Sequence, residues 1–183
     1  MSATRIFSIG HSTQSADALI AALRAGGVKQ VADVRRYPSS RRHPQFNRDT
    51  LISSLAAATI GYAHFPDLGG RRDPQPDSPN QGWREAGFRG YADYMLTAQF
   101  QHAMERLLEL ATREPLAMMC AEASWRSCHR ALIADILKLR GIEVVHLVDA
   151  SRSETHPYTA PARIVDGRLT YPAAEAAQRE LDL

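Results

Sequence analysis

The densest group of chemically reactive side chains in this 183-residue sequence lies between residues 120 and 130. The stretch carries two thiols, a carboxylate, an imidazole and a guanidinium, on Cys120, Cys128, Glu122, His129 and Arg130. If Ser127 caps a helix, the unpaired amides and dipole of its first turn favour an anion and the thiolate of Cys128. Glu122 would then act as a general base or pair with Arg130. The stretch therefore predicts an anion site beside a reactive thiol.

The same residues leave other interpretations open. From Cys120 to Arg126 the spacing C-x5-R-S is that of a cysteine-phosphatase loop, but this loop lacks glycine and Glu122 would repel phosphate. Cys120, Cys128 and His129 could bind zinc together with another histidine, yet their spacing is unusual for zinc and we expect no metal. A redox pair of the two cysteines lacks the short spacing of thioredoxin-type motifs. In the simplest interpretation Cys120 is a small buried hydrophobe and the nearby charges form a structural ion pair.

Short polar runs also follow three other apolar stretches, and their candidate residues are His11 and Ser12, Asp33 and Arg35, and Arg71. An imidazole such as His11 serves as a general base or an anion ligand. Arginine binds phosphate and carboxylate through two N–H groups at once. We therefore expect catalytic groups from Glu122, His11, Cys120 and Cys128, and substrate-binding groups from Ser12, Asp33, Arg35, Arg71, His129 and Arg130.

Alternating elements are predicted to position these residues. Apolar runs predict strands at residues 5–9, 30–34, 62–65, 116–120 and 143–148. Helical spacing predicts helices at 16–25, from 47 to near 61, from 97 to before 115, and at 127–140. A long loop is expected from 66 to about 90, and Asp166-Gly167 predicts a hairpin turn. The fold expected is a single-domain α/β protein with a mostly parallel, Rossmann-like, five-stranded sheet flanked by helices and a C-terminal hairpin extension.

Such a sheet explains why the polar runs matter together. Parallel strands joined by helices place all their carboxyl ends at one edge, where ligands bind in open α/β sheets. The four polar runs are therefore expected to share one rim. We expect one domain over residues 1–183, with a core at about 5–150 and an extension at 151–183.

Composition narrows the classes of protein. The apolar share of 44% suits a globular chain, and no run of about 18 apolar residues predicts a membrane helix. A strand is expected almost at the start, which leaves no room for a signal peptide. Two cysteines do not make a disulfide framework, so the expected setting is a reducing cytoplasm.

Charge is unevenly distributed although the net charge is only +2. Between residues 35 and 72 there are seven arginines and two aspartates, a local balance of 7 − 2 = +5. Together with the aromatic residues of F-R-G-Y-A-D-Y-M, this basic strip leaves nucleic-acid binding open as an alternative function.

Several segments together resemble the DUF488 family, a widespread bacterial and archaeal domain. They are S-I-G-H-S, A-D-V-R-R-Y-P-S-S-R-R-H-P-Q-F-N, L-G-G-R-R, F-R-G-Y-A-D-Y-M, and C-A-E followed by C-H-R. The resemblance spans roughly residues 5 to 150 and implies a compact α/β fold with a shared site. The family positions it implies are Gly10, His11, Ser12, Asp33, Arg35, Pro38, Pro44, Phe46, Cys120, Glu122, Cys128, His129 and Arg130. Arg126 has no typical counterpart, which weakens the phosphatase interpretation, and the resemblance implies no reaction.

The leading hypothesis is an enzyme acting on a small anionic substrate, phosphate-bearing or nucleotide-like. Arg35, Arg71 and Arg130 would hold the substrate, while Glu122 or His11 would transfer protons. The alternatives are a non-catalytic nucleic-acid-binding module and a thiol or metal sensor. The sequence identifies neither a cofactor nor a substrate, and it predicts no membrane partner.

Overall fold

The structure, a computed structural model, describes residues 5–174. Eight strands form a six-stranded sheet of order β3-β2-β4-β1-β5-β6 and a separate two-stranded hairpin. The strands are β1 (Arg5–Gly10), β2 (Gln30–Asp33), β3 (Gly61–His64), β4 (Leu116–Cys120), β5 (Glu143–Leu147), β6 (Ser153–Thr155), β7 (Arg163–Val165) and β8 (Arg168–Thr170). The first five are parallel to one another, and β6 pairs antiparallel with β5. The predicted α/β class with a mostly parallel sheet is confirmed.

Five α-helices connect the strands, and their ends follow local rules. They are α1 (Ala16–Ala25), α2 (Arg48–Ala57), α3 (Ala86–Tyr94), α4 (Ala98–Arg113) and α5 (Arg130–Leu139). Ser15 caps α1 by accepting from the Ala18 amide, and Thr97 caps α4 by accepting from the Phe100 amide. No helix among residues 5–174 is both long and apolar enough to cross a membrane.

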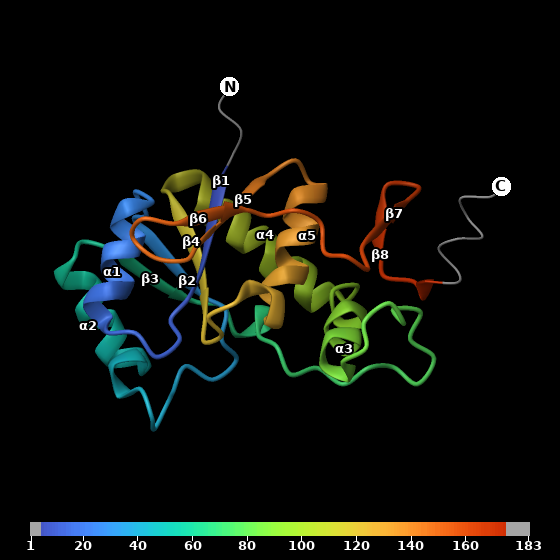
Figure 1. Cartoon of the computed structure of the whole chain (residues 1–183), viewed down its shortest axis with the longest axis horizontal. Helices are drawn as coiled ribbons and strands as arrows, with labels where there is room; N and C mark the ends of the chain where they lie inside the picture. Colours follow the sequence, from blue (N-terminus) through green and yellow to red (C-terminus); the bar gives the residue numbers. More distant parts are fainter. Residues whose placement is uncertain (1–4, 175–183) are drawn as a thin grey trace.

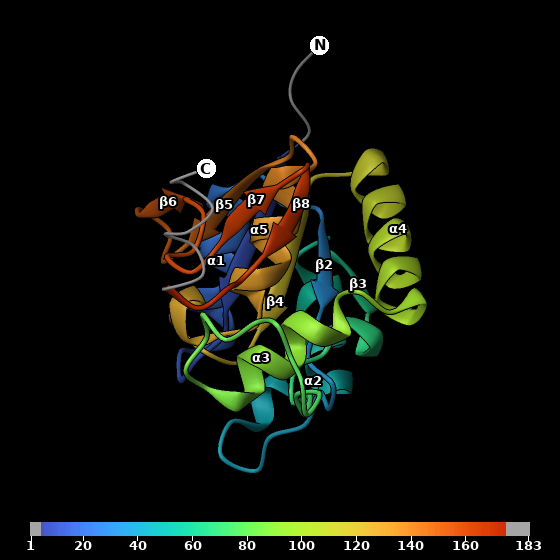
Figure 2. The ribbon, with the colours of Figure 1, turned by 90° about the vertical axis from the view of Figure 1, so that its right-hand side faces the viewer.

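The sheet is covered on both faces, so the core has two parts. On one face Ala117 and Met119 of β4 pack with Leu19 and Leu23 of α1, and with α2. On the other face the alternate β4 residue Met118 packs with α3, α4 and α5. Figure 1 shows α1 and α2 to the left of the strands and α5 to the right, while Figure 2 shows α4 at the right-hand edge of the molecule. Because both faces are buried, β4 is apolar throughout.

Strand order places a crevice at the carboxyl end of β4. β4 lies between β1 and β2. Its Cys120 is opposite Gly10 of β1, and its Met119 is opposite Asp33 of β2. The chain leaves β1 and β2 toward α1 and α2 on one face, but it leaves β4 toward α5 on the other. Connections that diverge to opposite faces open a ligand crevice between neighbouring strands. Here such a divergence occurs on both sides of β4.

Three features differ from the sequence prediction. The sheet has six strands instead of five, because the polar edge segment Ser153–Thr155 adds to β5. The expected loop 66–90 is shorter, because α3 begins at Ala86. Ser127 is not a helix cap: it ends a 3₁₀ turn, and α5 begins only at Arg130. The proposed first helical turn at Cys128 and His129 is therefore wrong.

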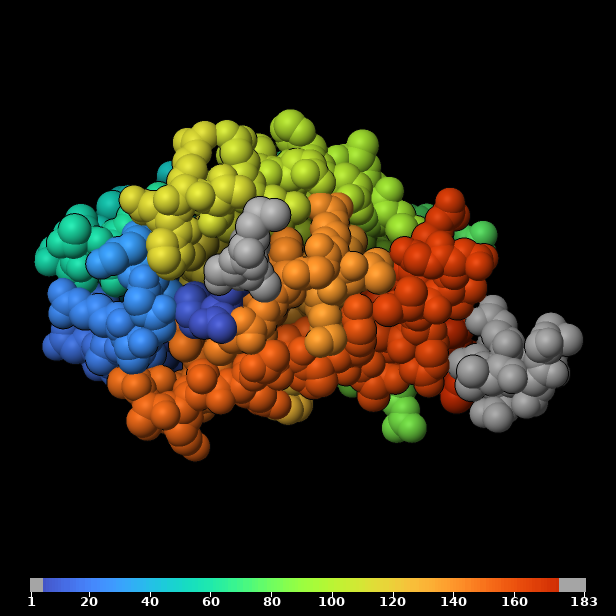
Figure 3. Space-filling view, turned by 90° about the horizontal axis from the view of Figure 1, so that it is seen from above, coloured from blue at the N-terminus to red at the C-terminus, as the bar shows by residue number. Residues whose placement is uncertain are grey.

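The C-terminal segment packs back onto α5. The predicted hairpin is confirmed as β7 and β8, and its turn has positive φ at Asp166 (49°) and Gly167 (73°). Tyr171 is 2% exposed and belongs to the core around α5. From above, the chain after β5 forms a continuous orange-to-red band along one side of the molecule (Figure 3).

Candidate functional site

Backbone hydrogen bonds beyond the strands bring three polar segments together. The His11 amide donates to the carbonyl of Cys120 at 2.9 Å, and the Ser12 amide donates to that of Ala121 at 2.9 Å. On the other side of β4 the Val34 amide donates to Met119 at 3.0 Å. The segments after β1 and β2 are thereby fixed against the segment after β4.

Three adjoining cavities open at this edge. The first, here called the strand-end cavity, has a volume of about 310 Å³ and is lined by Arg35, Arg36, Tyr37, Ser39, Gly70, Arg71, Cys120, Ala121, Glu122 and His129. The second, of about 370 Å³, shares six of these residues and adds His11, Ser12, Thr13, Ser40, His43 and Ala123. The third, of about 230 Å³, shares Gly70, Arg71, Glu122 and His129 with the first and adds Glu85, Gly87, Phe88, Ser127 and Cys128. The convergence predicted from strand topology is thus present in the structure. The largest cavity described, about 640 Å³, lies between the helices and the C-terminal hairpin and has none of the predicted site residues in its lining.

Arg35 is engaged largely by the protein itself. Its Nε and Nη2 donate to the two carboxylate oxygens of Asp33 at 2.9 and 2.6 Å, and its Nη1 donates to the carbonyl of Phe46 at 2.9 Å. Nη1 also lies 3.3 Å from Nε2 of His11. Tyr62 donates its hydroxyl hydrogen to Asp33 at 2.7 Å. Four of the five guanidinium N–H donors are therefore occupied, and Asp33 is wholly buried beneath the cavity floor.

His11 is held neutral by the same arrangement. Burial, together with the positive charge of Arg35, lowers the pKa of His11 to about 4, despite the opposing bond to Ser12. Its Nδ1–H donates to the Ser12 carbonyl at 2.9 Å, so Nε2 is the nitrogen that accepts from Arg35. Both ring nitrogens are occupied, so His11 is better placed to orient Arg35 than to exchange protons with a ligand.

Arg130 points into the protein and not into either cavity. It is 1% exposed, and its Nη1 and Nη2 donate to the Ser8 hydroxyl at 3.0 Å and to the backbone carbonyl of Glu122 at 2.6 Å. Its Nε lies 3.3 Å from Sγ of Cys128. The expected contact with the Glu122 carboxylate is not among these bonds, so Arg130 fixes the loop after β4 and does not face a ligand.

The two thiols differ in their surroundings. Cys120 is 5% exposed at the cavity wall, and its Sγ lies 3.0 Å from Oε2 of Glu122. A hydrogen bond to Cys128, burial, and the negative charges of Cys128 and Glu122 raise the pKa of Cys120 well above its usual range. Burial opposes ionisation of Cys128 as well, but the bond from Cys120 and the positive charge of Arg130 outweigh it and lower the pKa of Cys128. Cys128 is therefore the cysteine of the pair that ionises more readily.

His129 and Arg71 complete the wall between β2 and α5. The His129 Nε2–H donates to the Val34 carbonyl at 3.2 Å, and Nδ1 lies 3.8 Å from Sγ of Cys128. Arg71 is exposed at a φ of 60°, and its carbonyl accepts from Nη1 of Arg36 at 3.0 Å. Its neighbour Gly70 abuts the His129 ring.

The structure thus separates the predicted residues into two groups. Those that line a cavity of the rim are His11, Ser12, Arg35, Arg71, Cys120, Glu122, Cys128 and His129. Asp33 and Arg130 lie behind that wall and support it. Sequence reasoning missed Arg36, Tyr37, Ser39 and Gly70 as lining residues. Their position beside Arg35 and Arg71 was the available signal.

Comparison with known proteins places the chain in a family. Neither the curated proteins nor the solved structures that were searched gave a match. A family model described as a domain of unknown function, DUF488, matches residues 15–137. This range contains the segments after β2, β3 and β4, whereas His11 and Ser12 precede it. Because the model covers more than half of the sequence, the chain belongs to the DUF488 family.

Proposed function

We propose that the protein is an enzyme that acts on a small anionic substrate, phosphate-bearing or nucleotide-like, in the strand-end cavity. The observation that carries this proposal is the composition of the cavity wall. Three guanidinium groups and an imidazole surround one exposed carboxylate, that of Glu122, beside the thiol of Cys120. Cationic walls attract anions, and a carboxylate among them serves as a proton-transfer group.

The three arginines of the strand-end cavity differ in how far they are free to bind a substrate. The charge of Arg35 is neutralised by the carboxylate of Asp33, so Arg35 mainly holds the cavity wall in place and has one N–H group left for a ligand. Arg36 and Arg71 are exposed and face the same cavity. Guanidinium groups bind phosphate and carboxylate through paired N–H donors. Arg71 and Arg36 are therefore the groups assigned to the substrate.

Glu122 is the group assigned to proton transfer. It follows β4 by two residues, lies in the lining of all three hollows at this rim, and its backbone carbonyl is anchored by Arg130. The side chain is thus exposed while its main chain is held, which suits a catalytic group. Neither thiol is assigned as a nucleophile. The attacking species is a thiolate, and Cys128, the more readily ionised of the two cysteines, is only 2% exposed.

The test is a screen of phosphorylated metabolites and nucleotides for turnover, followed by kinetics of Glu122→Gln and Arg71→Gln. Glu122→Gln should lower kcat by about 10²- to 10⁴-fold with little change in KM. Arg71→Gln should raise KM by about 10-fold or more, since one charged hydrogen-bonding group is worth about 1.5–3 kcal/mol.

Exposed residues elsewhere provide matched controls, namely Glu109→Gln on α4 and Arg24→Gln on α1, and both should leave kcat and KM unchanged. Full activity in both cavity variants would refute the proposed roles.

Nucleic-acid binding is the second candidate, and exposure of the basic strip favours it. Arg36, Arg41, Arg42 and Arg48 are exposed, and Tyr37 is 63% exposed beside Arg36. Such a surface would bind phosphate backbones with an affinity that falls steeply with salt. Filter binding of single-stranded RNA and DNA at two salt concentrations distinguishes the two candidates.

A further inference from the structure

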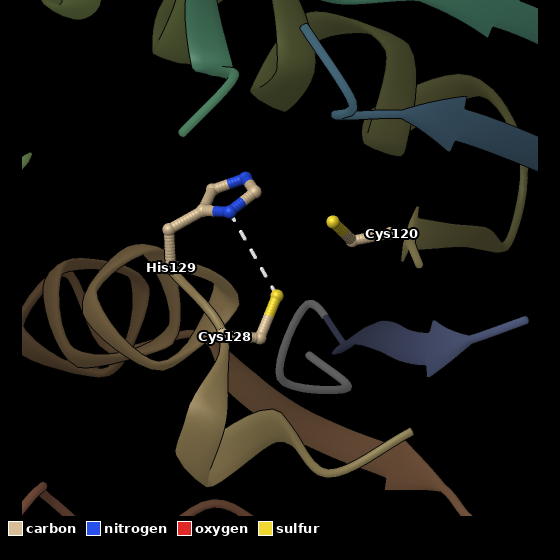
Figure 4. Close-up of side chains that lie close together, drawn as sticks. All are labelled: Cys120, Cys128 and His129. Atoms are coloured by element: carbon tan, nitrogen blue, oxygen red, sulfur yellow. Dashed lines mark hydrogen bonds between the residues drawn. The ribbon is translucent and has the colours of Figure 1, made fainter. Parts of the chain in front are cut away.

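We propose that Cys120, Cys128 and His129 form a binding site for a thiophilic divalent cation, with Zn²⁺ as the best match, at the wall of the strand-end cavity. Sγ of Cys120, Sγ of Cys128 and a ring nitrogen of His129 all lie within 4.8 Å of one another. In Figure 4 the Cys120 sulfur comes from the end of β4 and points toward the other two side chains, which come from the two residues just before α5. Among residues 5–174, this is the one group of three or more His, Cys, Asp or Glu side chains close enough together to hold a metal ion.

The separations suit a tetrahedral ion. With Zn–S of about 2.3 Å and Zn–N of about 2.0–2.1 Å, tetrahedral geometry requires an S···N separation of about 3.5 Å and an S···S separation of about 3.8 Å. The Cys128 Sγ to His129 Nδ1 distance is 3.8 Å, which is within a few tenths of an ångström of that value. The Cys120 sulfur lies within 4.8 Å of the other two ligand atoms, so it must approach them by no more than about 1.3 Å to reach these separations. Thiolate and imidazole ligands select zinc over magnesium and calcium.

The tautomer of His129 leaves the correct nitrogen free to bind a metal. A carbonyl oxygen only accepts, so the contact of Nε2 with the Val34 carbonyl at 3.2 Å puts the ring proton on Nε2. Nδ1 then presents its lone pair on the side of the two sulfurs. Metal-binding histidines usually donate their other N–H to a carbonyl or carboxylate in this way. A disulfide between the two cysteines would not require this orientation of the imidazole.

Neighbouring residues preserve the site. A Cβ at Gly70 would lie 2.9 Å from His129 Nδ1, so glycine keeps the space beside that nitrogen open. The Nε–H of Arg130 points to Sγ of Cys128 at 3.3 Å, and such N–H···S contacts orient a thiolate ligand. Cys120 and Cys128 are 5% and 2% exposed, so an ion held there would be shielded from bulk water.

The fourth position of the ion would be open to the cavity. Cys120 and His129 both line it, and Oε2 of Glu122 lies 3.0 Å from Sγ of Cys120. A site with three protein ligands and an open position is the arrangement of catalytic zinc, where the ion activates a bound water. Glu122 would stand beside that water or replace it. This catalytic use rests on the proposed function, whereas metal binding itself does not.

Metal binding is tested on the full-length protein, purified without a polyhistidine tag from zinc-supplemented cells and kept under reducing conditions. Elemental analysis should find one zinc per chain. Removal of zinc followed by addition of Co²⁺ should give thiolate-to-cobalt charge-transfer absorption, which needs no variant. Less than about one tenth of a zinc per chain together with no cobalt–thiolate absorption would overturn the proposal.

Variants then locate the ion. Cys128→Ser and His129→Gln should each weaken zinc binding, in competition with a chromophoric chelator, by more than the 10- to 100-fold typical of losing an outer partner. Gly70→Ala should weaken it without removing a ligand, and the exposed His102→Gln should have no effect. Unchanged affinity in Cys128→Ser and His129→Gln would place the zinc elsewhere and reject this site.

The test is independent of turnover. Glu122→Gln should retain the zinc while losing activity, so loss of the proposed enzyme function leaves the metal measurement interpretable. Conversely, an active protein that binds no zinc would reject the metal site alone. Quantitative formation of a Cys120–Cys128 disulfide, with no affinity of the reduced protein for zinc, would assign the pair to thiol chemistry and count against the site.

Discussion

Two clusters of polar side chains lie close to α5 in the chain or in space, and they contain similar residue types in different surroundings. The strand-end site combines Glu122, His129 and two thiols at a cavity wall. The second cluster, here called the α5 cluster, consists of Asp135, His146, His156, Thr159 and Tyr171 and is buried throughout. In one cluster polar atoms face a cavity, whereas in the other they face each other.

The α5 cluster is nearly saturated by its own members. One carboxylate oxygen of Asp135 accepts from His156 Nε2 and from the Thr159 amide, both at 2.9 Å. The other oxygen accepts from the Thr159 hydroxyl and from the Tyr171 hydroxyl, the latter at 3.0 Å. His156 Nδ1 lies 2.9 Å from His146 Nε2. An acid and two histidines in contact are therefore no sign of catalysis here. None of the cavities described is lined by Asp135, His146 or His156, and among these three only His146 Nδ1 lacks a hydrogen-bond partner in the described structure.

The sharpest way to break the α5 cluster is Asp135→Ala. The change leaves His156, Thr159 and Tyr171 without their shared acceptor, and buried donors without partners cost about 1–3 kcal/mol each. We expect the free energy of unfolding to fall by about 3–5 kcal/mol in urea titrations. Asp77→Ala, at an exposed position, should change it by less than about 0.5 kcal/mol. Equal stability of the two variants would show that the cluster is not structural.

A pair of arginine variants compares Arg71, which lines the cavity, with Arg130, which lies behind the cavity wall. Arg130→Met removes donors from Ser8, Cys128 and the Glu122 carbonyl, and should lower the free energy of unfolding by about 2–4 kcal/mol. Arg71→Met acts at an exposed cavity residue and should stay within about 0.5 kcal/mol of wild type. Chemical denaturation of both proteins side by side measures the difference. A large loss for Arg71→Met would contradict the assignment of Arg71 to ligand binding.

The smallest effect concerns pH. Burial, followed by the nearby charge of His156 and Arg130, lowers the pKa of His146 to about 2. Below pH 6.5 the unfolded chain takes up a proton at His146 that the folded protein does not, so stability falls as pH decreases. This residue should contribute up to about 1.4 kcal/mol per pH unit to the slope of unfolding free energy against pH between pH 6 and 4.

His146→Gln should reduce this slope, and the exposed His102→Gln should not. Identical slopes in all three proteins would rule out a buried neutral His146.

Strongly apolar elements were predictable, whereas weak ones depended on their neighbours. The β4 segment is a continuous apolar run, and its prediction was accurate to the residue. The Ser153–Thr155 strand is three residues long and polar, so only its pairing with β5 defines it. In α3, Gly87 and Gly90 oppose helix formation, but Gly90 packs against the backbone of Arg72 at a distance where a side chain would collide.

For the site, the sequence predicted where residues meet but not how they face. Strand topology brought His11, Arg35 and Glu122 to one rim, as expected. Whether an arginine faces a ligand or a backbone carbonyl depends on side-chain packing, and side-chain packing leaves no periodic pattern in the sequence. Arg130 is the example, because its guanidinium is used by Ser8, far away in sequence. Likewise the start of α5 is set by the 3₁₀ turn Trp125–Ser127, which competes with a serine cap.

The order of strands also has a consequence for how the protein comes to be folded. β4 is formed by residues 116–120, yet it is the partner that both β1 and β2 require. In a nascent chain that ends before β4, β1 and β2 each have an edge whose hydrogen-bonding partner has not yet been made. Contacts between segments that are far apart in sequence also form slowly. These exposed edges invite pairing with other chains until β4 is inserted. The chain must therefore be synthesised at least as far as His129 before the lining of the strand-end cavity is complete.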